Sequence, residues 1–428
     1  MRPGFSKKIG RAACTASILI FMTFCAIFFA DIIYFPNEIN LTENIAHNLK
    51  FNLPFTATIE PDTVSALKVN SEPVTENINV SLAKPFTVES GESGTASMTL
   101  RAFGFPLKKI TLDILPDIEV VPCGMTVGVS IKPPGVMVLG TGSVKADAGL
   151  TQSPSEGKLM SGDHILSANG EATNSDEDLQ RIIAESDGEI DLKVERDDKI
   201  IDARVNGVKS TDDGANKLGV WVRDSTKGIG TMTFYNPQDN VFGALGHGIL
   251  DVDTKKLMKV KEGYITQASI SSIRKGGKGS PGELTGELDQ NEKLGRIKVN
   301  TPYGIYGYLD ISGLLEIKSE KLPIAMQDQI HEGPAVIYSD VDNSVEKYDV
   351  FIESVNRYSS DETKGMVLRI TDPALLRKTN GIVQGMSGSP IIQEGKLIGA
   401  VTHVFVQEPA KGYGIFIENM LKAAKNVQ

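Results

Sequence analysis

The sequence predicts a mainly β protein with one apolar helical segment at its N-terminus. Three observations support this prediction. Short runs of alternating apolar and polar residues recur along the chain, 42 glycines and 20 prolines provide turns between them, and few stretches have the spacing of an amphipathic helix. At 428 residues the chain has room for about two to four domains.

Residues 12–30 form an uncharged, apolar stretch that follows the basic residues of segment 1–11. A helix of this length can cross a hydrocarbon core of roughly 30 Å. The basic flank places the tip 1–11 in the cytoplasm and everything after residue 30 on the other side of the membrane. A cleaved signal peptide is the competing interpretation. The long apolar stretch and the lack of a clear A-x-A site favour an uncleaved anchor.

Charge and cysteine content exclude several classes of protein. The net charge of −10 argues against nucleic acid as a partner, because phosphate binding needs clustered Lys and Arg. Cys14 and Cys25 lie in the apolar stretch, so Cys123 is alone in the exported part and no intramolecular disulfide is expected there. Neither C-x-x-C nor H-E-x-x-H occurs, and we expect no metal and no other cofactor.

Residues 31–118 read as a small β-rich linker module. Residues 97–103 and 110–115 alternate with period two, as half-buried strands do, and Gly104 and Pro106 lie where a turn is needed. No catalytic chemistry can be assigned to this segment.

Residues 119–208 have a different pattern. Strand signals at 127–131 and 135–140 precede the string G-D-H-I-L-S-A-N-G, a helical pattern begins after the N-cap Ser175, and a strand covers 189–196. At these residues the segment resembles a PDZ domain of the bacterial protease-associated kind. The resemblance implies that it binds an extended peptide or a chain terminus as an added strand. The region 138–142 lacks a G-L-G-F string, so the residues that hold the peptide stay unassigned.

Residues 209–428 are the largest unit and are strand-rich, which predicts a sandwich or a barrel. Two helices are expected, around residues 373–378 and 417–424. We expect Trp221, the single tryptophan, to be a core residue.

Two glycine-framed loops in this unit suggest nucleophilic catalysis. In G-M-S-G-S-P the glycines allow a tight loop around Ser387, in which the backbone N–H groups of Gly385 and Ser387 can hold an oxyanion. The hairpin after this loop gives the arrangement found in chymotrypsin-like serine proteases, with His247 of A-L-G-H-G as the base. Alternatively, the G-M-S-G-S-P loop is an ordinary turn and His247 is an ordinary buried histidine. Asp251 and Asp253 near His247 hint at a metal but have no fourth ligand.

The acid that would orient the base is harder to choose. Asp372 precedes Ser387 by 15 residues, and Asp310 and Asp349 are alternatives. Asp372 followed by Pro373 is also a common helix start, so this carboxylate has a competing role as an N-cap.

Three longer strings, at 244–249, 273–283 and 370–393, resemble the stage IV sporulation protein B family of PDZ-containing serine endopeptidases. The resemblance implies a chymotrypsin-like double β-barrel with His247 as general base, Asp372 as orienting acid and Ser387 as nucleophile. It also implies a membrane-anchored protein exported into the forespore intermembrane space. There it would cleave itself and then a membrane-bound regulator, triggering late sigma-factor processing in sporulation.

Two alternatives remain at this stage. The glycine-lysine run 274–282 lacks the spacing of a phosphate loop, so we interpret it as a flexible surface loop near the active site. A catalytically inactive protease fold that acts as a PDZ scaffold or adaptor between membranes is the rival function. The predicted organisation is a cytoplasmic tip (1–11), an anchor (12–30), a linker module (31–118), a PDZ-like domain (119–208) and a protease domain (209–428).

Overall fold

The computed structural model describes residues 35–427 except 147–149, 358 and 360. It divides into two compact units. The first unit contains the chain up to Ile118 together with Met326–His331 and Asn356–Glu362, and the second contains the remainder. Among the described residues, no helix has the length and apolar character needed to cross a membrane. The predicted anchor 12–30 lies outside the described residues.

The first unit is a β-sandwich whose two sheets enclose one apolar core that includes Leu41, Ile59 and Met98. The alternation predicted at 110–115 is confirmed: Ile110, Leu112 and Ile114 are buried and the residues between them are not, and β7 (Phe86–Ser90) shows the same pattern. One sheet has the order β1 (Glu38–Thr42), β9 (Phe105–Leu115), β8 (Gly94–Ala102), β3 (Thr56–Pro61) and β6 (Ile78–Ser81). The other has the order β2 (His47–Leu49), β7, β4 (Leu67–Val69) and β5 (Glu72–Pro73).

A six-stranded ring of antiparallel pairs forms the first barrel of the second unit. The ring closes because β11 pairs with β24 on one side and with β22 on the other. Around the ring the strands are β11 (Thr126–Lys132), β24 (Glu262–Arg274), β25 (Gly282–Thr301), β26 (Gly304–Leu309), β23 (Val241–Ala244) and β22 (Thr226–Asn236). The short strands β10 (Glu119–Pro122) and β27 (Leu322–Pro323) extend the sheet from β22.

A second closed barrel follows in the chain. Its strands are β28 (Gly333–Asp340), β29 (Val345–Val355), β30 (Met366–Ile370), β34 (Lys411–Phe416), β33 (Lys396–Val404) and β32 (Pro390–Gln393). The predicted helices are confirmed as α4 (Pro373–Thr379) and α5 (Ile417–Ala424). The remaining short elements of this part of the chain are α3 (Ile311–Glu316), η2 (Gln327–Gln329), which belongs to the first unit, η3 (Glu362–Lys364) between β29 and β30, and η4 (Lys425–Val427) after α5. The unit therefore has the double-barrel architecture of chymotrypsin-like proteases.

The long hairpin of β24 and β25 extends beyond the first barrel. Near its tip, β25 pairs in parallel with β31 (Val383–Gln384), the strand directly before the Ser387 loop. The tip is the glycine-lysine run, where the Gly276 N–H donates to Thr379 O and Asn380 Nδ2 donates to Gly276 O. This run is thus bound to the segment that precedes the predicted nucleophile.

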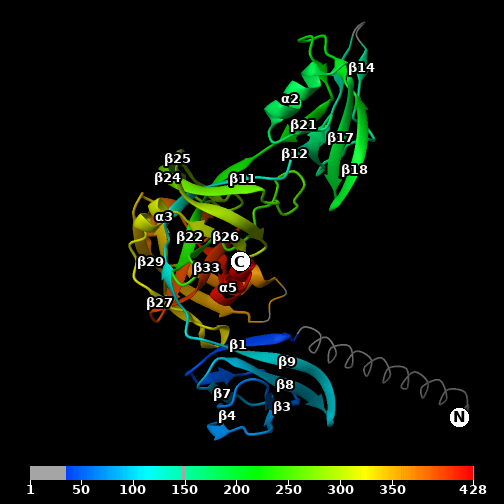
Figure 1. Cartoon of the computed structure of the whole chain (residues 1–428). Coiled ribbons are helices and arrows are strands. Elements are labelled where there is room, and N and C mark those ends of the chain that lie inside the picture. Colours follow the sequence, from blue (N-terminus) through cyan, green and yellow to red (C-terminus); the bar gives the residue numbers. More distant parts are fainter. Residues whose placement is uncertain (1–34, 147–149, 358, 360, 428) are drawn as a thin grey trace, which may run out of the picture. The chain divides into compact units, whose positions relative to one another are not determined.

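A smaller unit, called here the inserted unit, lies between β11 and β22 and forms the green lobe of Figure 1. Its sheet has the order β18 (Lys199–Asn206), β17 (Glu189–Arg196), β15 (His164–Ala168), β12 (Val136–Thr141) and β21 (Val220–Arg223). Helix α2 (Asp176–Glu185) begins as predicted, since Ser175 Oγ accepts from the Asp178 N–H. Short pairs complete it: β13 (Val144–Lys145) with β14 (Thr151–Gln152), β16 (Glu171–Ala172) with β15, and β19 (Val208–Lys209) with β20 (Asn216–Lys217).

Two expectations differ from the structure here. The predicted boundaries 119–208 and 209–428 do not follow the strand pairing, because β11 belongs to the first barrel and β21 to the inserted unit. Trp221 is not a core residue: it is 63% exposed, and its ring lies against Gly142. Val220 and Val222, its neighbours on β21, are the residues that pack on the core of this unit.

Candidate active site

The loop between β31 and β32 holds Ser387 in a constrained backbone. Gly388 has φ +99°, a backbone conformation that residues with a side chain rarely adopt, and a Cβ there would collide with the carbonyl oxygen of Thr231. The Ser387 hydroxyl donates to Thr402 O on β33 at 2.7 Å. The glycine spacing that predicted a tight nucleophile loop therefore has a direct steric reason.

The base loop begins where β23 ends. Gly246 has φ +69°, which turns the chain before His247, and a Cβ there would lie 3.1 Å from the methyl groups of Thr402 and Ile415. The Nδ1 atom of His247 lies 3.0 Å from Gly248 O. A carbonyl only accepts, so Nδ1 carries the proton in this tautomer and Nε2 is left as the acceptor that a general base needs.

Thr231 of β22 joins the two loops. Its N–H donates to Ser387 O at 3.0 Å, and its carbonyl oxygen accepts from the Leu245 N–H at 3.1 Å. Since His247 follows Leu245 by two residues, the structure brings the predicted base and the predicted nucleophile to the same place between the barrels. In this geometry the hydroxyl of Ser387 bonds to Thr402 O, and the described residues show no hydrogen bond from it to His247.

The side chain of Thr231 adds a third bond that sequence reasoning missed. Its hydroxyl donates to Gly385 O at 2.7 Å, and the residue is 1% exposed. Gly385 has φ +104° and is one of the two residues predicted to supply oxyanion N–H groups. A buried threonine on a strand has no local sequence signature, because its partners lie about 150 positions away.

Burial lowers the pKa of the His247 imidazole, and the hydrogen bond to Gly248 O opposes this only in part. Removing the ring from water disfavours its charged form, so His247 is neutral and able to accept a proton at neutral pH. A second imidazole lies beside it: the rings of His247 and His403 are 5.0 Å apart between centroids. His403 is the residue after Thr402, and no pattern in the sequence singled it out.

The structure does not bring Asp372 to this place. Its Oδ1 accepts from the N–H groups of Ala374 and Leu375, so the carboxylate caps α4, as the competing interpretation expected. Ile415, at the Gly246 end of β34, is four residues from Lys411, which pairs with Arg369, three residues before Asp372. Four residues at about 3.3 Å each place Ile415 and Lys411 about 13 Å apart along β34. Among the described residues, Asp372 and His247 form no hydrogen bond or ion pair with each other.

The alternative acids are also placed elsewhere. Asp310 precedes α3, where its N–H donates to Leu294 O, and Asp349 lies on β29, where its carbonyl oxygen accepts from Thr371 and Asp372. The turn 301–303 does pack on the base loop, since the Gly248 N–H donates to Pro302 O. It contains Thr301, Pro302 and Tyr303 and therefore offers no carboxylate.

Asp251 and Asp253, which hinted at a metal, face an arginine instead. Arg223 Nη1 lies 2.8 Å from Asp251 Oδ2, and Nη2 lies 3.1 Å from Asp253 Oδ2. The Arg223 guanidinium already occupies one oxygen of each carboxylate, which disfavours a metal cation there. Three carboxylates of the inserted unit also lie close together, those of Asp176, Glu177 and Asp224, but all three side chains are accessible to water.

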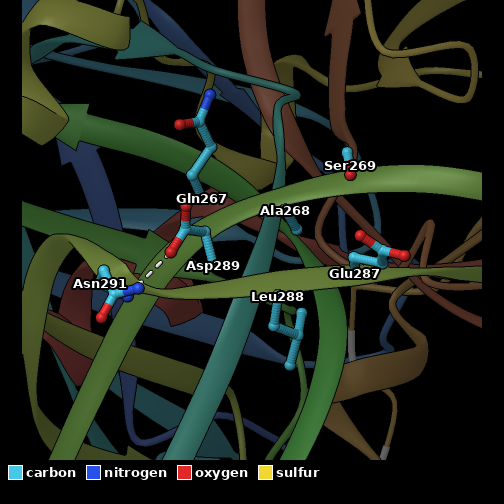
Figure 2. Close-up of a pocket in the computed structure, with 7 residues that line it drawn as sticks. All are labelled: Gln267, Ala268, Ser269, Glu287, Leu288, Asp289 and Asn291. Atoms are coloured by element: carbon cyan, nitrogen blue, oxygen red, sulfur yellow. Dashed lines mark hydrogen bonds between the residues drawn. The ribbon is translucent and has the colours of Figure 1, made fainter.

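A polar hollow of about 640 Å³ lies on the β24–β25 hairpin, and none of its lining residues belongs to either glycine-framed loop (Figure 2). The Asn291 N–H donates to Asp289 Oδ1 at its rim, and Gln267, Ser269 and Glu287 complete its polar lining. No histidine lines it, so the Ser269 hydroxyl has no imidazole base in the hollow, and the hollow is not the site of acyl transfer.

Two β-barrels with a glycine-framed serine and a neutral histidine between them define a serine peptidase, a hydrolase that acts on peptide bonds. Residues 214–421 match the family described as SpoIVB peptidase S55. The match contains both loops and most of both barrels. It starts within the inserted unit, so the N-terminal sandwich lies outside it.

The chain is also similar to a protein of Helicobacter pylori (strain J99) whose name describes a zinc metalloprotease. The two are 28% identical over 146 residues, which are 33% of this chain and 39% of that protein. The chain thus matches well under half of that relative's length.

Proposed function

We propose that this peptidase is an endopeptidase in which Ser387 is the nucleophile and His247 the general base. Ser387 Oγ attacks a peptide carbonyl while its proton passes to His247 Nε2. The backbone N–H groups of Gly385 and Ser387 stabilise the oxyanion. The proton then moves to the leaving amine, and water, deprotonated by the same imidazole, releases the acyl group. The convergence of the two glycine-framed loops at Thr231 is the observation that carries this proposal.

For this reaction the Ser387 hydroxyl must leave Thr402 O and turn toward His247. Catalytic hydrogen bonds often shorten only when substrate is bound, so the observed donor direction is compatible with the mechanism. Asp372 has no part in the proposed reaction, because its carboxylate caps α4. The proton on Nδ1 is instead held by Gly248 O.

Labelling with a fluorophosphonate tests the nucleophile, since this probe reacts with an activated serine. The wild-type chain should be labelled, and Ser387→Ala should abolish labelling. His247→Ala should slow it by at least 10³-fold, because an unactivated hydroxyl is a poor nucleophile. Lack of labelling in the wild type, with and without added peptide, would favour the rival function of an inactive scaffold or adaptor.

We propose further that the inserted unit is a PDZ-like peptide-binding unit. Strand β21 is at the edge of its sheet. Two contacts, one before and one after this strand, place it beside α2. Asn216 Nδ2, just before β21, donates to Ser186 O at the end of α2, and Asp224, just after β21, lies beside Asp176 and Glu177 at its start. An extended peptide could add to this edge and lie along α2.

The sequence before β21 supports the same proposal. Leu218, Gly219 and Val220 form a glycine turn at the start of the edge strand, with Gly219 at φ +65°. The backbone N–H groups of such a turn can hold a terminal carboxylate. The region 138–142, which lacks a G-L-G-F string, lies on and directly after the neighbouring strand β12. Trp221 fluorescence should therefore change with a peptide that has a free carboxylate and less with its C-terminal amide.

The cellular role is proposed from the family resemblance. The chain would be anchored by residues 12–30 with its bulk exported to the forespore intermembrane space, would cleave itself, and would then cleave a membrane-bound regulator of sigma-factor processing. Expression of the full chain tests self-cleavage. Fragments that are present in the wild type and absent in Ser387→Ala would support it, whereas an intact wild-type chain that is labelled by fluorophosphonate would exclude it.

A further inference from the structure

The segment that follows His247 folds back on itself as a small hairpin, residues 249–258, called here the base hairpin. Leu250 and Leu257 form a β-bridge, and the Met258 N–H donates to Ile249 O. At its root, Asn300 of β25 accepts from the Ile249 N–H and donates to the carbonyls of Ile249 and Met258. The root is thus fixed to the first barrel within two residues of the proposed base.

The tip of the base hairpin is organised by one buried carboxylate. Asp251 is 2% exposed, and its Oδ1 accepts from the N–H groups of Asp253 and Thr254. Burial alone would raise the pKa of this carboxyl. The hydrogen bonds from Thr254 and Asp253, together with the charge of Arg223, outweigh burial and lower it, so Asp251 is charged.

The cation that faces Asp251 comes from the inserted unit. Arg223 is the last residue of β21 and reaches Asp251 with one guanidinium nitrogen and Asp253 with the other. Its side chain is 28% exposed. In the described part of the chain no other Lys or Arg forms an ion pair with Asp251.

Lysines of the same segment add further contacts to the inserted unit. Lys256 pairs with Asp197, and Lys259 pairs with Glu195 and Asp198. Both lysines and the two aspartates are exposed, and only Glu195 is mostly buried, so these pairs are weak in water. They join the base hairpin and the residue after it to the inserted unit, whereas the Arg223 pair is the one that involves a buried carboxylate.

We propose that Arg223 is a positioning residue for catalysis, through which the inserted unit holds the base hairpin and thereby His247. Without the guanidinium, Asp251 is a buried charge with no counterion, and the tip gains by opening to water. When the tip opens, it pulls on the root hydrogen bonds between Ile249, Met258 and Asn300, and a shift of Ile249 reaches His247 because only Gly248 separates them. The inference rests on His247 as base, but not on peptide binding by the inserted unit.

Fluorophosphonate labelling of the full chain tests this proposal. We expect Arg223→Met to slow labelling of Ser387 by about 10²-fold, the effect of displacing a catalytic group by about 1 Å. Arg204→Met is the matched control, because it removes an exposed arginine that pairs with Asp191 and Glu189 in the same unit. Its labelling rate should stay within about twofold of the wild type.

A rescue separates positioning from general damage. Asp251→Asn keeps an oxygen for the two tip N–H groups but removes the charge, so Arg223→Met with Asp251→Asn should recover to within about tenfold of the wild-type rate. If Arg223→Met does not fold, Arg223→Lys replaces it. Lysine keeps the charge but cannot reach both carboxylates, so a loss of about tenfold is expected.

Hydrogen exchange gives a second readout that does not depend on activity. The amides of Asp253 and Thr254 should exchange faster in Arg223→Met and return toward wild-type rates in the double variant. Wild-type labelling by Arg223→Met would overturn the proposal. So would slow labelling without faster exchange at the tip, or without rescue by Asp251→Asn. An unlabelled wild type whose tip still responds to Arg223→Met would contradict the proposed function and leave the contact intact.

Discussion

Replacing Asp372 by asparagine and by alanine separates the two roles that this residue has been given. Its carboxylate caps α4 by accepting from Ala374 and Leu375. Asparagine caps about as well, whereas alanine leaves these N–H groups without the cap and costs about 1 kcal/mol. For a domain of roughly 150–250 residues, that corresponds to a fall of about 2–4 °C in the thermal midpoint. We therefore expect a lower Tm for Asp372→Ala and little change for Asp372→Asn.

The activity of Asp372→Asn is the decisive measurement. An orienting acid that is replaced by its amide lowers kcat by about 10⁴-fold with the fold intact. The structure separates the Asp372 end of β30 from the Gly246 end of β34 by about 13 Å along the strand, so we expect labelling within about threefold of the wild type. The assay is the fluorophosphonate rate constant, with Ser387→Ala as the blank. A loss of several orders of magnitude in a folded Asp372→Asn variant would refute the reasoning and restore Asp372 as the acid.

Three further outcomes follow from the site. Thr231→Val removes the hydroxyl that donates to Gly385 O, so it should slow labelling by about 10²-fold and lower the free energy of unfolding by about 1–3 kcal/mol. Thr231→Ser keeps a hydroxyl and should retain most of the labelling rate and of the stability. Equal losses in the two variants would contradict the role of the hydroxyl. Burial lowers the pKa of His247, so activity should persist below pH 6.5 and fall only as pH drops through that lower pKa; an acid limb above pH 6.5 would contradict it. Gly388→Ala should abolish labelling, because its Cβ collides with Thr231 O; an active, folded variant would show that the loop tolerates another backbone conformation.

The sequence predicted best those features that depend on neighbouring residues. Gly385 and Gly388, on either side of Ser387, have positive φ, a local backbone conformation that glycine adopts most readily, and Asp372 before Pro373 forms the helix start that its sequence indicates. The helix after Ser175 and the alternating strands of the N-terminal sandwich are local patterns of the same kind.

Features that depend on distant partners could not be predicted in this way. Strand β11 pairs with β22 across an insertion of about 90 residues, so its membership of the first barrel leaves no trace in periodicity. The same holds for Thr231, whose partners are Leu245, Gly385 and Ser387. Trp221 was misassigned because a large aromatic residue on a strand resembles a core residue unless the face it occupies is known.

The ends of the inserted unit lie on adjacent strands, where Ile131 pairs with Thr226, so they are separated by about 5 Å, the spacing between strands. A foreign module with similarly close termini could be grafted at this junction while the barrel keeps its own hydrogen bonds. A gene fusion at this junction can therefore add a module in one step. If the added module binds a small molecule, the same junction allows a peptidase to be engineered whose activity depends on that molecule.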